Sequence, residues 1–192
     1  MAITSIRNIA LVLASSALVL SQSFGRTHRE QAEALLKDAF GEASRVSPLA
    51  LSLRSFEKDS LRVLTKQDFA GDTLHLLVAS NGDKTLGYAI VDNVKGKDQL
   101  ITYCVVVDEQ LAVKDIEILA YREPYGGEVQ NSSWLKQFFG KQPNDELRPG
   151  REIKNITGAT ISSRAITLGV KKLLALLHII QARLPHNTLS TK

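Results

Sequence analysis

Cysteine is almost absent from this 192-residue sequence, and the single one, Cys104, excludes an internal disulfide and any metal site built on clustered cysteines. A basic stripe with interleaved aromatic residues is also missing, because lysine and arginine are spread along the chain and the formal net charge is only +4. Nucleic-acid binding is therefore not expected. The sequence also lacks a Ser/His/Asp set, an HExxH motif and a P-loop, so it indicates none of the enzyme classes that depend on them.

The first 23 residues differ from a folded domain in charge and hydrophobicity. Arg7 is their only charged residue, and an apolar run over 9–20 is followed by the small or polar residues Ser21, Gln22 and Ser23. This order is typical of a secretory signal peptide, and the run is short for a membrane span of about 20 residues. Because no clean Ala-x-Ala site precedes residue 24, an uncleaved N-terminal anchor stays open as the alternative. Either form predicts export to the periplasm or the outer face of the cytoplasmic membrane.

The section after this segment predicts one helix and then a sheet. Thr27 can cap a helix over 27–43, with Glu30 three residues on and apolar side chains at helical spacing behind it. Five strands are expected, at 61–64, 73–79, 86–91, 100–107 and 113–120, each bounded by turn signals. Their short connections predict antiparallel neighbours. Cys104 falls in the fourth strand, where a buried, inert thiol is expected.

The end of the sequence carries the clearest helical pattern. Apolar residues from Ile166 to Leu184 are spaced by four and three, which predicts a helix covering a sheet, and Pro185 ends it. A loop-rich section over 121–150 precedes it, with a short helical stretch near 133–139 in which Trp134 and Phe138 are expected to pack together. The predicted fold class is α+β: an antiparallel sheet with a long C-terminal helix packed on it and an N-terminal helix.

Residues 157–163 read Thr-Gly-Ala-Thr-Ile-Ser-Ser and run directly into the last helix. Gly158 and Ala159 are small, which lets a bulky group approach the backbone. Thr160 offers a hydroxyl at the helix start, where unpaired N–H groups and the helix dipole form a seat for a phosphate. The simpler interpretation is that Thr157 or Thr160 caps the helix and the glycine permits the turn.

The segment 157–160 resembles the flavinylation motif, Ser/Thr-Gly-Ala-Thr, of the FMN-binding domain found in G subunits of Rnf complexes and C subunits of sodium-translocating NADH:quinone reductases. The resemblance implies that Thr160 bonds covalently to the phosphate of FMN and that a flavin transferase of the ApbE type installs it. Together with the sequence patterns, it predicts a signal peptide or anchor (1–23), a helical N-terminal segment (24–60), the FMN-binding domain (61–185) and a tail (186–192).

A second block, Tyr121-Arg-Glu-Pro-Tyr-Gly-Gly127 with the Trp134 helix after it, is similar to the family's Glu-Thr-Pro-Gly-Leu-Gly loop and following helix. The resemblance implies that Glu123 hydrogen-bonds at the flavin site and that Gly126 and Gly127 let the backbone approach the ring; a solvated carboxylate and an ordinary tight turn are the alternatives. Where the family usually has an acidic residue before the motif, this chain has Lys154, a candidate counter-charge for the phosphate. The expected cofactor-binding residues are Thr160, Thr157, Gly158, Ala159, Ser162, Glu123, Gly126 and Gly127.

The function that these expectations favour is an exported flavoprotein electron carrier. Its partners would be the flavin transferase and a membrane electron-transfer complex or another exported redox protein. Two other classes stay open: a small FMN-dependent reductase component, which would need an ionisable group beside the ring, and a non-redox exported domain with Thr160 as a helix cap.

Overall fold

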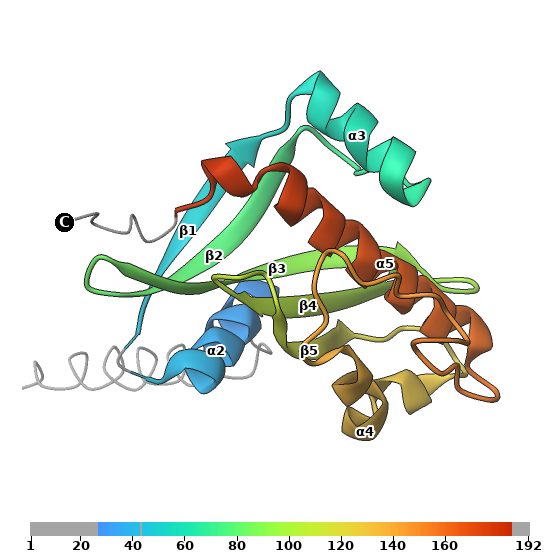
Figure 1. Ribbon diagram of the computed structural model, residues 1–192. Coiled ribbons are helices and arrows are strands. Elements are labelled where there is room, and N and C mark those ends of the chain that lie inside the picture. Colours follow the sequence, from blue (N-terminus) through green and yellow to red (C-terminus); the bar gives the residue numbers. More distant parts are fainter. Residues whose placement is uncertain (1–26, 43, 186–192) are drawn as a thin grey trace, which may run out of the picture.

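The structure, a computed structural model, describes residues 27–42 and 44–185 (Figure 1). The predicted signal peptide or anchor and the predicted tail lie outside these residues. Among the residues that are described, no helix is long and apolar enough to cross a membrane.

Within the described residues, five strands form one antiparallel sheet in which each strand pairs with its neighbour in sequence. They are β1 (Arg45–Ser52), β2 (Thr73–Asn81), β3 (Lys84–Lys95), β4 (Leu100–Asp108) and β5 (Val113–Ala120). In the central register, Val105 of β4 lies between Ile90 of β3 and Ile116 of β5. The sheet, together with helices at both ends of the chain, confirms the α+β class.

The expected strand over 61–64 is wrong. These residues belong to helix α3 (Ser55–Thr65), which buries Leu61 and leaves Val63 and Leu64 exposed. Four consecutive apolar-rich residues do not distinguish a strand from one turn of an amphipathic helix. The strand that completes the sheet is β1, an edge strand containing Pro48. An edge position tolerates a proline because no ladder hydrogen bond is required on its open side.

Helices cover both faces of the sheet (Figure 1). Helix α2 (His28–Phe40) lies on one face, and its N-terminus carries the expected capping box between Thr27 and Glu30. The other face is covered by the long helix α5 (Thr160–Ile179), which also contacts α3 and is followed by the short 3-10 helix η3 (Gln181–Arg183).

Strand β4 divides its side chains between these two layers. Tyr103, Val105 and Val107 join the core under α5, whereas Cys104 and Val106 join the smaller core under α2. A strand with both faces buried reads as a continuous apolar run rather than an alternating one. The thiol of Cys104 is buried as expected, and burial raises its pKa well above the usual value.

Three short helices between β5 and α5 hold the segment that leads into α5. They are η1 (Gly127–Gln130), α4 (Ser132–Leu135) and η2 (Lys136–Phe138). Trp134 and Phe138 pack edge to face with ring centroids 5.3 Å apart, which confirms that Trp134 is a core residue. The Trp134 indole Nε1 donates to the carbonyl oxygen of Lys154 at 2.6 Å, so this aromatic pair fixes the chain shortly before the predicted motif.

Candidate functional site

The predicted motif forms a tight turn that ends at the first residue of α5. Gly158 has a φ of +86°, a conformation that favours glycine, and the Ala159 amide donates to the Ile156 carbonyl at 3.0 Å. A Cβ at Gly158 would meet no atom of the described residues within 4 Å. The turn therefore needs this glycine for its backbone conformation, and not because neighbouring atoms leave too little room.

Thr160 is the first residue of α5, and its side chain is exposed. The residue at the N-cap is Ala159, and in the described part of the chain no side chain makes a capping hydrogen bond there. The interpretation of Thr157 or Thr160 as the helix cap is therefore wrong. The Thr160 hydroxyl instead donates a long hydrogen bond, 3.3 Å, to the carbonyl of Ile156.

The start of α5 also offers hydrogen-bond donors to an anion. The backbone N–H groups of Thr160, Ile161 and Ser162 belong to the first turn, where helix geometry provides no intrahelical acceptor. The positive end of the helix dipole lies at the same place. An acidic group attached to Thr160 would therefore meet donors and a partial positive charge.

The loop after β5 is joined to the start of α5 through Tyr121. Its hydroxyl donates to the carbonyl of Tyr125 at 2.6 Å and lies 3.1 Å from Oγ of Ser162, which must then be the donor of that second bond. Gly126 has a φ of +84°, and a Cβ there would lie 2.7 Å from the Tyr121 hydroxyl and 3.3 Å from the Ala159 side chain. Both its conformation and the close contact require glycine at position 126.

Glu123 links this loop to the turn between β3 and β4. Its Oε1 accepts hydrogen bonds from the backbone amides of Asp98, at 2.8 Å, and Gln99, at 3.0 Å. Above all the Gln99 amide, and with it the Asp98 amide, lowers the pKa of Glu123 below its usual value. The carboxylate is therefore ionised at neutral pH and holds two loops together; that it also hydrogen-bonds a cofactor stays a prediction.

A cavity of about 330 Å³ lies between these three segments. It is bordered by Lys97, Asp98, Glu123, Pro124, Tyr125, Gly126, Gly158, Ala159, Thr160, Ile161 and Ser162. Six of the eight residues expected from the sequence are thus brought together around one hollow. The other two lie beside it: Thr157 is exposed in the turn before the helix, and Gly127 begins η1.

The sequence did not predict the contribution of the β3–β4 turn. Lys97 and Asp98 border the cavity, and Lys97 brings a cation to it from a segment distant in sequence. In sequence these residues read only as a turn between strands, and their place at the site depends on the hairpin folding towards Glu123. Lys154, the candidate counter-charge, does not border the cavity; its carbonyl and amide are held by Trp134 and Gln137.

The described residues contain no cluster of metal-binding side chains. What the cavity does present is an accessible hydroxyl, the backbone donors of a helix start, a lysine and an exposed aromatic residue, Tyr125, whose exposed fraction is 83%. This set suits a phosphate-bearing organic group held near the surface.

Known proteins that resemble this chain bind a cofactor of this kind by the name of their family. The family model of the FMN-binding domain matches residues 96–175, a range that contains every residue bordering the cavity. The G subunit of the proton-translocating ferredoxin:NAD(+) oxidoreductase complex of Clostridium ljungdahlii is 28% identical over 138 residues, which cover 66% of this chain and 75% of that protein. The crystal structure of NqrC from Shewanella oneidensis shares the fold, with a TM-score of 0.55 and 14% identity over 77% of this chain and 86% of that one.

Proposed function

We propose that this chain, which contains an FMN-binding domain of the type found in Rnf G subunits and NqrC, is an exported electron carrier whose FMN is joined by a phosphoester to Thr160. The observation that carries the proposal is the Thr160 hydroxyl itself. It stands exposed at the edge of the cavity, at the start of a helix that it does not cap.

The residues around the cavity fit such a group. A phosphoester on Thr160 keeps one negative charge, which the amides of the first helical turn and the positive charge of Lys97, a residue that borders the cavity, would offset. With a flavin adenine dinucleotide donor, the Thr160 oxygen forms the new P–O bond, the P–O–P bond of the donor breaks, and AMP leaves as the hydroxyl proton is released. The Ile156 carbonyl then loses a donor, but that hydrogen bond is long at 3.3 Å and its loss costs little. The cavity, at about 330 Å³, is at the small end of ligand sites, which suits a cofactor that a covalent bond retains.

The ionisation state of Glu123 argues against this residue as the proton donor of a reductase. FMN supplies the electron-transfer chemistry of its isoalloxazine ring, and the protein supplies position and electrostatics. A reductase would also need a group that donates a proton to the substrate near neutral pH. Glu123 is the wrong group for this task, because backbone amides hold its pKa below the usual value and keep it deprotonated.

Export gives a reason for covalent attachment. FMN is made inside the cell, so an exported domain that lost it could not replace it, and a phosphoester removes dissociation. Residues 1–23 would place the domain in the periplasm or at the outer face of the cytoplasmic membrane, as a signal peptide or as an anchor. The partners are then a flavin transferase of the ApbE type and a membrane electron-transfer complex or another exported redox protein; the Clostridium relative is by name part of a complex.

In-gel fluorescence tests this proposal. The full-length chain is produced with and without a flavin transferase, the cells are fractionated, and denaturing gels are viewed for flavin fluorescence. We expect a fluorescent band at the size of this chain, only with the transferase and only in the exported fraction. A band without fluorescence in the presence of an active transferase contradicts the proposal. Sustained turnover of a small molecule by the labelled protein favours the reductase.

A further inference from the structure

A second hollow lies directly beside the proposed flavin cavity. It is a groove of about 430 Å³ along α5, and Ile161 borders both hollows. Arg164 and Lys172 of α5 border it on one side, and Asn93 and Lys95 of β3 on the other. We call it the Arg164 groove. Arg164 follows Thr160 by four residues, so the two side chains lie on one face of the helix, one turn or about 5.4 Å apart.

The groove presents hydrogen-bond donors and positive charge. No carboxylate is among the described residues that border it. The Asn93 Oδ1 accepts from the Thr102 hydroxyl at 2.7 Å, which leaves the amide nitrogen of Asn93 as a donor. Arg164 is exposed and has no hydrogen-bond or ion-pair partner among the residues that the structure describes, and the exposed Lys95 bonds only to the carbonyl of Asp98.

The third cation of the groove is already neutralised. The ammonium of Lys172 forms an ion pair with Asp92 at 2.8 Å, and both side chains are largely buried. The Tyr103 hydroxyl donates to the same carboxylate at 3.1 Å. The accessible charge of the groove therefore comes from Arg164 and Lys95.

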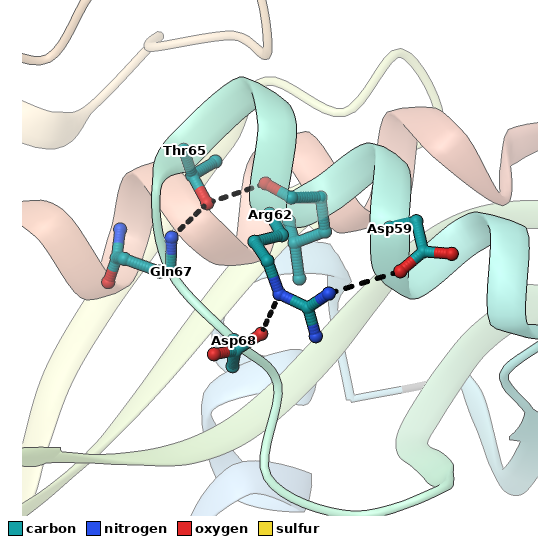
Figure 2. A network of polar contacts seen from close by, with 6 residues as sticks. Asp59, Arg62, Thr65, Gln67 and Asp68 are labelled. Carbon is teal, nitrogen blue, oxygen red and sulfur yellow. Dashed lines mark hydrogen bonds and ion pairs between the residues drawn. The ribbon is translucent and has the colours of Figure 1, made fainter.

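The segment that follows α3 also reaches the groove. Gln67, just after α3, borders the groove and donates through Nε2 to the Leu168 carbonyl. Ile161, which also borders the groove, is 53% exposed. Figure 2 shows that the acidic side chains of this region, Asp59 and Asp68, both bond to Arg62.

We propose that the Arg164 groove is the surface at which this protein exchanges electrons with an acidic redox protein. The inference rests on the proposed function, since it requires FMN at Thr160. Transient redox encounters use small interfaces and are steered by complementary charge. Arg164 has no partner among the described residues and lies one helical turn from the flavin attachment point, and with the exposed Lys95 and Ile161 it provides that combination.

Stopped-flow electron transfer between charged proteins tests the inference. The flavinylated protein is photoreduced with EDTA as the electron donor and mixed at low ionic strength with ferric cytochrome b5, whose surface is acidic, or with ferric cytochrome c, whose surface is basic. We expect Arg164→Glu and Lys95→Glu each to slow reduction of cytochrome b5 by about tenfold, the lower end of electrostatic steering, and to leave cytochrome c no slower. Added salt should slow the wild-type reaction with cytochrome b5.

Matched controls separate steering from a change in net charge. Lys84→Glu at the β2–β3 turn and Lys114→Glu on β5 make the same charge change at exposed positions that border neither hollow. Both should keep cytochrome b5 rates within about twofold of wild type. Arg164→Gln should give an intermediate loss, which a merely misfolded variant would not.

The outcomes that overturn the inference are distinct from those that overturn the proposed function. A dark gel band overturns the proposed function and the inference with it. A fluorescent band with equal cytochrome b5 rates for Arg164→Glu and Lys84→Glu overturns the inference alone. If Arg164→Glu slows oxidation by ferricyanide but not by cytochrome b5, the groove binds small anions and the docking proposal is wrong.

Discussion

The two ends of helix α5 are built in opposite ways. At its start, Thr160 and Ile161 are exposed, the first turn has no side-chain cap among the described residues, and a cavity lies alongside. Just beyond its far end, Arg183 of η3 donates two hydrogen bonds of 2.8 Å to the Glu57 carboxylate, and Glu57 is only 1% exposed. The Tyr88 hydroxyl also bonds to the carbonyl of Pro185.

This difference separates stability from function along one helix. The far end and the buried middle of α5 fix the helix against the sheet, so the start can keep polar groups unsatisfied and accessible. Binding sites are commonly drawn from such less constrained positions on a rigid scaffold. Substitution of the exposed Thr160 should therefore alter flavin attachment with little loss of stability, and changes at the far end should lower stability without altering attachment.

Thr160→Ala should have the largest effect, a complete loss of covalent flavin. The substitution removes the oxygen that forms the phosphoester, while Thr160 donates only one long hydrogen bond in the fold. In-gel fluorescence after production with the transferase measures attachment, and thermal unfolding measures stability. Thr160→Ser should keep part of the labelling, because it retains the hydroxyl; a fluorescent Thr160→Ala band would show that another residue carries the flavin.

Gly158→Val should remove most of the labelling. Valine strongly disfavours the φ of +86° found at Gly158, so the turn before Thr160 must rearrange. Gly140→Val is the matched control: its φ is +75°, and a Cβ there likewise meets no described atom within 4 Å.

Both glycine variants should lose stability, by about 1–3 kcal/mol, but only Gly158→Val should lose fluorescence. Equal labelling of the two would mean that the conformation of the turn is not what presents Thr160 to the transferase.

Glu57→Gln should destabilise the protein by about 2–3 kcal/mol, because it leaves the half-buried Arg183 without its charged partner. Labelling should be unchanged, since this end of α5 is remote from the cavity. Chemical denaturation of the two proteins measures the difference. Equal stabilities would show that the ion pair does not hold the far end.

The pH dependence of Glu57→Gln sharpens this prediction. Burial alone raises the pKa of Glu57, but hydrogen bonds from the Arg54 amide and Arg183 outweigh it and lower the pKa below 4.5. A lowered carboxylate pKa stabilises the fold above the unfolded value and loses that contribution as pH falls through the folded value. The stability difference between wild type and Glu57→Gln should therefore shrink below about pH 4.5; a difference that grows there contradicts the assignment.

Tyr121→Phe should have the smallest effect, about 1 kcal/mol of stability, since it removes the hydroxyl that joins Tyr125 and Ser162. Because this hydroxyl links the loop to the start of α5, labelling should slow by a few-fold without being lost. A time course of in-gel fluorescence checks this rate. An unchanged rate would show that the loop need not be fixed for attachment.

Local sequence patterns were sufficient to predict the helices and strands that are long or bounded by clear capping or turn residues. The spacing from Ile166 onward predicted α5, the Thr27 and Glu30 pair predicted the start of α2, and turn signals located β2 to β5. The strand β1 and the helix α3 were not predicted, because a proline, Pro48, lies within β1 and the residues 61–64 of α3 resemble a strand. The edge position lets β1 contain a proline, and packing of one helix face makes 61–64 part of α3. Both depend on the assembled sheet and not on the local sequence.

The candidate site was predictable where it is continuous in sequence and not elsewhere. The segment from Thr157 to Ser162 is recognisable as a motif, whereas Lys97 and Asp98 reach the cavity only because the β3–β4 turn folds onto Glu123. The role of Glu123 as an acceptor for two backbone amides is likewise a tertiary contact, for which a lone glutamate in a loop gives no signal.

Peptide mass spectrometry tests the central claim most directly. Tryptic cleavage after Lys154 and Arg164 releases residues 155–164, a peptide with four hydroxyl side chains: Thr157, Thr160, Ser162 and Ser163. For chain produced with the transferase, we predict that this peptide carries the added mass of an FMN phosphoester and that fragment ions place it on Thr160. The unmodified peptide mass, or an added mass on any of the other three hydroxyls, would contradict the account.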